Sequence, residues 1–436
     1  MIDNTFRIAA SWGQAPLAGE RDVADIRMEA GREVLSRVLD VGTGEVRDRF
    51  RASAVSLALW FTDNWWRLRW EPLGGRYPSP DWRLAHELSS AGSGFNWPPM
   101  MMYGTGARVV FGPAFGGRLS SGPIRYLEMN HVHVVAGAHF EATLDAFINT
   151  TIHGCANAVD GAALLALYRQ LHDERADPEV ADWRALEARL GFDPDAAPDG
   201  LIETLAAKQD FLGREAVEEA AVAAAGPDAA IALNAAVEAT QASGLSVSLD
   251  IAGAIDLSTY DPRQPLWSWG EDAAREVRRR LGLGNEPFGA AAFAELLDQS
   301  WDTIRAADAT AHNLPYAALM REGSASAKLA LAMRPVVYRR FELARVVGDA
   351  IWMGAEAFGV ISRSKTDRQK FQRGFAQALL CPFQEVLRYI DAEDPTEEQI
   401  TRAARRFEVH ESVVRTLLVN KNVLPRETLL DRLEAA

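Results

Sequence analysis

Apolar and polar residues alternate at several short stretches in the first third of the chain, which is the spacing expected of half-buried strands. Turn residues bound these stretches, so the pattern predicts strands at residues 6–11, 25–28, 34–39, 108–111 and 128–135. One longer segment, residues 55–70, repeats its large side chains at helical spacing: Leu57, Trp60, Phe61, Asn64, Trp65 and Leu68. The first region, residues 1–151, is therefore predicted to be a strand-containing module.

The second region, residues 152–243, is helical in pattern throughout. Each of its predicted helices carries one apolar stripe, and they span 160–175, 178–190, 201–212 and 214–224. Glycine and proline interrupt the pattern at 191–198 and 226–227. We therefore expect a helical connector.

The third region begins with a predicted strand at 245–251 and an irregular stretch at 261–269, and has a second strand at 329–333. Helices are predicted at 271–281, 290–299, 340–357, 367–380, 396–407 and 411–420. The fold class predicted for the chain is α+β and multidomain. Its expected parts are 1–151, 152–243, 244–394 and a helical tail, 395–436.

Composition narrows the functional classes. The chain has 436 residues and a net charge of −14, which disfavours broad attraction to nucleic acid or anionic membranes. Two cysteines cannot build a disulfide framework or a cysteine-based metal cluster, so a cytoplasmic location is expected. No signal peptide and no apolar run of about 18 residues is visible, so no membrane segment is predicted. Seven of the twelve tryptophans precede Pro98, and this dense set is predicted to be core.

The most informative motif is Phe-Glu-Leu-Ala-Arg-Val-Val-Gly-Asp at residues 341–349. A catalytic zinc helix reads His-Glu-x-x-His, where two histidines one turn apart bind Zn²⁺ and the glutamate acts on the attacking water. Here the three positions hold Arg345, Val346 and Asp349. The motif therefore predicts a peptidase helix that has lost its catalytic residues.

Residues 265–425 resemble the ImmA/IrrE family of metallopeptidases. Four segments in family order carry the resemblance: GEDAAREVRRRLGLGNEPF, RRFELARVVGDAI, RQKFQRGFAQALLCP and PTEEQITRAARRFEVHESVVRTLLVN. The resemblance implies a zincin-like, mostly helical domain followed by a helix-turn-helix-like tail. It also implies that Gln369 stands at the position of the third zinc ligand, a glutamate in the family.

The departures from the family imply that no metal or other cofactor is bound. A guanidinium has donors and no lone pair to offer a cation, so Arg345 cannot be a ligand, and Val346 has no proton chemistry. Asp349 and the amide oxygen of Gln369 alone do not make a zinc site. Arg345 and Asp349 share a helix face and are expected to pair with each other.

Four other sets of residues could carry chemistry or binding. Arg402, Arg405, Arg406 and Arg415 make the tail a possible binding face for nucleic acid, but residues 363–421 hold 11 basic and 9 acidic residues, 11 − 9 = +2, which favours an ordinary solvated surface. The same holds for the basic run 363–373. His131 and His133 alternate on a predicted strand, with His139 and Glu141 in the same parity, and are a weaker metal alternative. His86 and Glu87 imitate half of the zinc motif, without its second histidine.

These observations favour a non-catalytic binding or regulatory protein with a protein partner. By resemblance, the setting would be stress response, mobile-element control or phage defence, and the partner a transcriptional regulator. One alternative is an active zinc peptidase with displaced ligands, such as Asp349, Glu356 or His312, that cleaves a repressor-type protein. A second alternative is a DNA-binding regulator acting through the tail. Nucleic acid is the less favoured partner, and no membrane is expected.

Overall fold

A computed structural model of the chain describes residues 5–13, 22–74, 78–115, 123–127, 129, 132–155, 158–261, 264–307, 314–323, 325–333, 336–354 and 356–425. The fold is mixed α and β, with several small antiparallel sheets. It divides into two compact units. Unit 1 holds the described residues up to Ala206 with 225–227 and 364–366, and unit 2 holds 207–224, 228–363 and the described residues from 367 onward. The predicted division into four parts stays a prediction.

Unit 1 contains three small antiparallel sheets among its described residues. The first joins β1 (Phe6–Ser11), β2 (Val23–Ala30), β3 (Glu33–Val34) and β6 (Phe50–Ser53). The second joins β7 (Met100–Gly104), β8 (Arg108–Pro113) and β10 (His133–Ala136). The third joins β4 (Val38–Asp40), β5 (Val46–Arg47) and β9 (Ile124–Tyr126).

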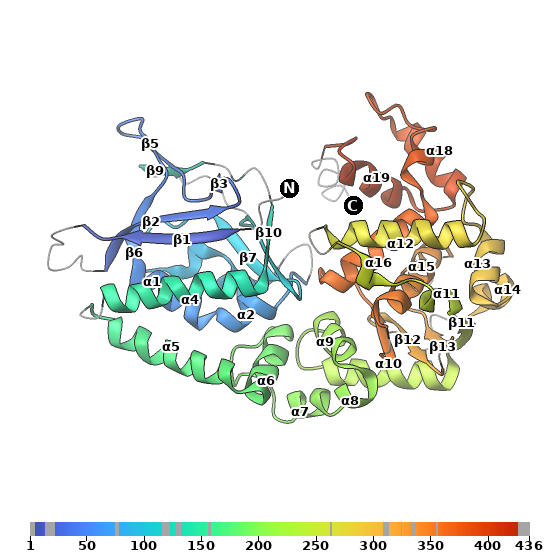
Figure 1. Cartoon of the computed structure of the whole chain (residues 1–436), viewed down its shortest axis with the longest axis horizontal. Helices are drawn as coiled ribbons and strands as arrows, with labels where there is room; N and C mark the ends of the chain where they lie inside the picture. The colour runs from blue at the N-terminus through green and yellow to red at the C-terminus, as the bar shows by residue number, and fades with distance from the viewer. Residues whose placement is uncertain are drawn as a thin grey trace. The chain divides into compact units, whose positions relative to one another are not determined.

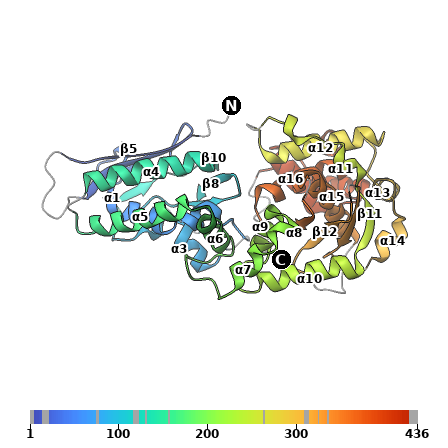
Figure 2. The same cartoon turned by 60° about the horizontal axis from the view of Figure 1, so that its bottom comes forward.

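Helices line these sheets. Those of unit 1 are α1 (Ala54–Asp63), α2 (Trp65–Trp70), α3 (Pro80–His86), α4 (Gly137–Gly154), α5 (Gly161–Ala176), α6 (Pro178–Arg189) and α7 (Leu201–Ala206), with a 3-10 turn η1 at Leu88–Ala91. Helix α1 packs against both α4 and α5 (Figure 2). The expectation that the early tryptophans form core is confirmed for five of them, which are buried: Trp60, Trp65, Trp66, Trp82 and Trp97.

Three predictions in unit 1 need correction. The single helix predicted over 55–70 is two helices, because the chain turns at Asn64, whose side-chain amide donates to the Trp60 carbonyl at 2.9 Å. The strand predicted at 34–39 is split between β3 and β4, which belong to different sheets. His139 and Glu141 do not continue a strand, since helix α4 begins at Gly137.

Unit 2 is built on an antiparallel sheet in the order β11-β13-β12-β14. These strands span Leu245–Ser248, Ser326–Ala330, Ala317–Arg321 and Phe358–Ile361, respectively. Leu319 and Leu329 are paired across the sheet and belong to the main hydrophobic core. Their neighbours Met320 and Lys328 contact Gln241 of helix α10 (Ala229–Ser243) instead. The alternation of a strand therefore places the core on one face and α10 on the other.

Helix α15 (Val336–Trp352) packs on the core face of the sheet, α16 (Asp367–Leu380) packs on α15, and α12 (Leu266–Arg280) packs on α16 (Figures 1 and 2). Helices α12 and α16 approach so closely that glycine is needed on both. A Cβ on Gly270 would lie 2.4 Å from the Phe371 carbonyl oxygen, and a Cβ on Gly374 would lie 2.4 Å from that of Trp267. This contact fixes α16 against the rest of the unit.

The remaining helices of unit 2 are α8 (Gln209–Leu212), α9 (Arg214–Ala223), α11 (Asp250–Gly253), α13 (Ala290–Leu297), α14 (Trp301–Ala306), α17 (Phe383–Val386), α18 (Glu397–Phe407) and α19 (Glu411–Asn420), with a 3-10 turn η2 at Leu257–Thr259. Thr396 caps α18 in a capping box with Gln399. No helix in the described part of the chain has the length and apolar character needed to cross a bilayer.

Predictions for unit 2 erred mainly at strands. The stretch 245–251 is a strand only to Ser248 and then becomes α11, and the strand predicted at 329–333 ends at Ala330. The helix predicted over 340–357 ends at Trp352, and the stretch 261–269, expected to be irregular, contains the start of α12. Strands β12 and β14 were not predicted. Both are short and largely buried, so they lack the alternation that marks a half-exposed strand.

Candidate functional site

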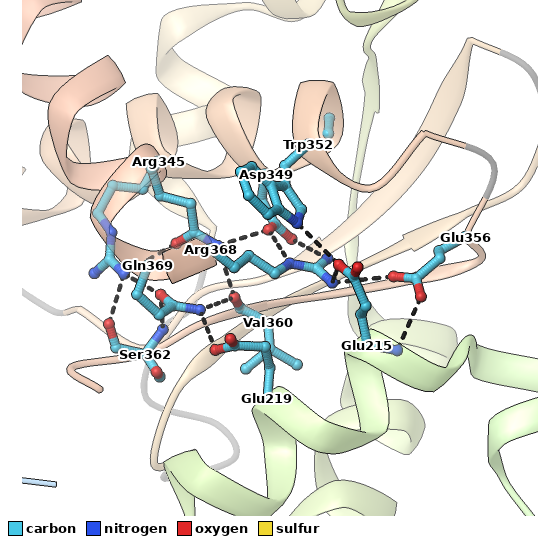
Figure 3. A network of polar contacts seen from close by, with 12 residues as sticks. Glu215, Glu219, Arg345, Asp349, Trp352, Glu356, Val360, Ser362, Arg368 and Gln369 are labelled. Atoms are coloured by element: carbon cyan, nitrogen blue, oxygen red, sulfur yellow. Dashed lines mark hydrogen bonds and ion pairs between the residues drawn. The ribbon is translucent and has the colours of Figure 1, made fainter. Parts of the chain in front are cut away.

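Helices α15 and α16 bring together three of the four positions identified from the zinc motif and the family resemblance. Arg345 and Asp349 lie one turn apart on α15, and Gln369 faces them from α16 (Figure 3). Strand β14 passes beside them, with Ser362 directly after it. Val346, the position of the general base, is fully buried in the hydrophobic core. The site is therefore composed of polar side chains from two helices and the backbone of an edge strand.

Arg345 is held by oxygen atoms of neighbouring groups. Its Nη2 donates to the Ser362 carbonyl, to Gln369 Oε1 and, at 3.0 Å, to Gln372 Oε1. Only 9% of the residue is exposed. Burial lowers the pKa of Arg345 to about 9, helped by repulsion from Arg373, so its guanidinium still carries a charge at pH 7. A buried cation thus occupies the position where the family resemblance would put a zinc ligand.

Asp349 is fully buried and pairs with Arg368. Arg368 donates from Nε to Oδ1 at 2.6 Å and from Nη2 to Oδ2 at 3.0 Å, and Gln372 Nε2 also donates to Oδ1 at 2.6 Å. The predicted pairing of Arg345 with Asp349 is therefore wrong. A two-point guanidinium–carboxylate contact satisfies the buried carboxylate better than a pair along one helix does.

Arg368 was expected to lie on a solvated basic face and is instead 3% exposed. Burial acts to lower its pKa, but the carboxylates of Asp349, Glu219 and Glu356 outweigh burial and raise it. Its Nη1 lies 3.0 Å from Glu356 Oε2. Arg368 is therefore a permanent cation that neutralises the buried acids around it.

Gln369 connects the two helices to the strand. Its Oε1 accepts from the Ser362 N–H at 3.0 Å, and its Nε2 donates to the Val360 carbonyl at 2.8 Å and to Glu219 Oε2 at 2.9 Å. Glu219 comes from α9 and is 7% exposed. The amide is thus fully used within the unit, as buried polar groups require.

These residues do not fit a zinc ion. Arg345 and Arg368 are donors only, and the side-chain oxygens of Asp349 and Gln369 already accept hydrogen bonds from neighbouring guanidinium, amide and backbone N–H groups. Across the described ranges, no three His, Cys, Asp or Glu side chains gather in a way that could hold a metal. Of the displaced ligands considered above, Asp349 and Glu356 both contact Arg368, while His312 lies outside the described residues. The arrangement pairs buried arginines with carboxylates, and its amide and guanidinium groups hold β14 in place by hydrogen bonds.

The basic tail is only partly exposed. Arg402, Arg405 and Arg406 are exposed on α18, and Arg406 lies 3.3 Å from Glu286. Arg415 is 8% exposed, and its Nη1 donates to Glu397 Oε1 at 2.8 Å. Arg415 therefore does not belong to the proposed binding face, and its role is to join α19 to α18.

The histidine alternatives have structural partners. His133 Nε2 lies 2.7 Å from Glu33 Oε2, and His131 lies outside the described residues. His86 is fully buried, with Nδ1 2.7 Å from the Met102 carbonyl oxygen and Nε2 2.9 Å from Glu71 Oε2. The Trp82 ring stacks on it at 4.1 Å. His86 serves as a buried hydrogen-bonding residue of unit 1.

Sequence reasoning missed Gln372 and Glu219 and gave Arg368 the wrong environment. One signal for the α16 residues was present. Arg368, Gln369 and Gln372 fall on one face of α16, at i, i+1 and i+4, within a helix whose other buried residues are mostly apolar. No comparable signal exists for Glu219, because α9 lies about 150 positions earlier in the chain.

Comparison with family models, with curated proteins and with solved structures gives no match to this chain. The resemblance to the ImmA/IrrE metallopeptidases rests on the four segments quoted above.

Proposed function

We propose that unit 2 contains a zincin-like domain, residues 244–394, that has lost catalysis and serves as a binding or regulatory module. The observation that supports this proposal is the hydrogen bond from Arg345 to Gln369, two residues that the resemblance aligns with zinc ligands. A guanidinium charge now lies where the family resemblance would require a cation to be bound. An arginine at this position supplies a positive charge without supplying the Lewis acid on which zinc-dependent hydrolysis relies.

The proposed partner is a protein, and by resemblance a transcriptional regulator with a helix-turn-helix fold. The helices α18 and α19 would form the helix-turn-helix-like tail of this domain. Under this proposal the protein binds its partner without cleaving it, and chelators do not change the binding. The process served would be stress response, mobile-element control or phage defence.

A redesigned zinc site tests the alignment on which the proposal depends. The variant combines Arg345→His, Asp349→His and Gln369→Glu, which supply two imidazoles and a carboxylate. It also carries Arg368→Met, because Arg368 would otherwise lose its main carboxylate partner. We expect one zinc ion per chain with a Kd of roughly micromolar or tighter, measured by titration calorimetry.

The matched control has alanine in place of histidine at position 349 and should lose most of this affinity. A redesigned variant that is folded by circular dichroism and binds no zinc would show that these positions do not face one another as in a zinc peptidase. The proposal of a former peptidase domain would then be rejected.

A further inference from the structure

Strand β14 lies at the edge of the unit 2 sheet and pairs with β12. The register joins Leu319 to Gly359 and Ala317 to Ile361, and the Arg321 N–H donates to the Ala357 carbonyl at 2.9 Å. Residues 357, 359 and 361 therefore turn their backbone groups toward β12. In an antiparallel pair the alternate residues, Val360 and Ser362, point theirs to the outer edge.

Side chains occupy this outer edge. The single carboxamide of Gln369 donates to the Val360 carbonyl and accepts from the Ser362 N–H, so it satisfies two backbone groups two residues apart, as a neighbouring strand would. Gln372 Nε2 donates to the same Val360 carbonyl at 3.0 Å, and Arg345 donates to the Ser362 carbonyl. Open edges pair readily with other chains, and these side chains block such pairing.

Helix α9 holds the blocking side chains in place. Glu219 accepts from Gln369 Nε2 at 2.9 Å, on the opposite side of the amide from Arg345 (Figure 3). One turn earlier, Glu215 Oε2 accepts from Trp352 Nε1 at 2.9 Å and lies 3.8 Å from Arg368 Nη1. The Glu215 N–H donates to Glu356 Oε1 at 3.0 Å. The helix is therefore attached at two successive turns, both times through a carboxylate.

The start of α9 fits closely against the same site. Gly213, which precedes the helix, has φ of +100°, and a Cβ there would lie 2.8 Å from the Glu356 carboxyl group. The rest of the buried face of α9 is made of small side chains, Ala216, Val217, Ala220, Ala221 and Val222. Small side chains bury less apolar area per residue than large ones, so the buried Glu219 carboxylate adds to what attaches the helix. Glu215 contributes less, because its side chain is 58% exposed.

The charge balance of the site depends on α9. Arg345, Arg368 and Arg373 lie near Glu219, and burial lowers the pKa of Arg373 to about 10 while Glu219 acts against that shift. Apart from α9, the acidic side chains near these arginines are Asp349, Glu356 and Glu342. Helix α9 adds the buried Glu219 and the more exposed Glu215. The helix thus supplies the acidic groups that these buried cations need.

We propose that α9 is an autoinhibitory latch, attached through Glu215 and Glu219, that keeps the outer edge of β14 and the adjoining arginines covered. Its release is the step that makes this surface available to a partner. This inference deepens the proposed function, since it names the regulation of the same site. In the closed state, α9 makes the contacts described above.

Hydrogen exchange of the intact protein tests the latch. The double variant Glu215→Ala, Glu219→Ala should speed amide exchange in the segment 357–363 by roughly tenfold or more, while the sheet strands β11 and β13 keep their wild-type rates. Glu219→Gln keeps an acceptor and removes the charge, so it should give a smaller increase. The matched control is Glu218→Ala, on the same helix but paired with Arg214 at 3.1 Å, which should leave segment 357–363 unchanged.

Unchanged exchange at 357–363 in the double variant would overturn the latch, and so would acceleration of every unit 2 segment together, which would mean that α9 is an inseparable part of the fold. The experiment uses neither zinc nor a partner. Its failure would therefore leave the proposed loss of catalysis standing, and failure of the redesigned zinc site would leave the latch standing.

Discussion

Replacing Asp349 with alanine is expected to lower the free energy of unfolding of unit 2 by about 3–5 kcal/mol. The reason is that Arg368, 3% exposed, would lose the two-point contact with its main carboxylate and remain a buried cation. The Gln372 amide would lose an acceptor as well. The slowest-exchanging amides of the unit 2 core report this loss directly.

The control for this variant is Asp302→Ala, which removes a carboxylate that is 86% exposed and paired with Arg305 at 3.1 Å. That change should stay within about 0.5 kcal/mol of wild type, as expected of a surface ion pair. A loss of less than about 1 kcal/mol for Asp349→Ala would mean that the Asp349–Arg368 contact is not formed in the folded protein.

The second large effect is expected from Gly359→Ala, at roughly 3 kcal/mol of lost stability. Strand β14 passes so close to α15 that a Cβ at residue 359 would lie 2.2 Å from Asp349 Oδ2 and 2.9 Å from the Leu319 side chain. The methyl group would push Asp349 away from Arg368. Gly253→Ala is a suitable control, because nothing lies within 4 Å of its Cβ position.

A double-mutant cycle shows whether the carboxylate is the obstacle. In the Asp349→Ala background, Gly359→Ala should cost at least about 1 kcal/mol less than in wild type, because the clashing oxygen is gone. Strict additivity of the two substitutions would place the source of the strain at another neighbour of residue 359, such as the Leu319 side chain of β12.

The limits of sequence reasoning are clearest at β12 and β14. Helices such as α16 and α18 can be predicted from apolar residues at helical spacing, and α18 also has a recognisable N-cap at Thr396. Strand β14 is four residues long and buried on both faces, so it has no period that could be read. The edge strand that the proposed latch covers could therefore not be predicted from the sequence.

The sequence predicted which positions belong to the site but not how their side chains contact one another. The spacing of Arg345 and Asp349 on one helix face followed from helical geometry, and Gln369 followed from the family resemblance. The hydrogen-bonding partners of these residues could not be predicted, because they depend on which side chains the fold buries together. Arg368 reads as one more charge in a basic run, and only the fold shows that it is buried against Asp349. Glu219 reaches Gln369 across 150 positions, a distance that no local pattern spans.

Anomalous diffraction at the zinc absorption edge, from crystals grown with zinc, tests the central claim most directly. The account predicts no anomalous peak within about 2.5 Å of the Asp349 carboxylate, which is beyond the usual zinc–oxygen bond length. It also predicts Arg345 hydrogen-bonded to Gln369 and Asp349 bonded to Arg368. A zinc peak coordinated by Asp349 and Gln369, with Arg345 turned away, would contradict it.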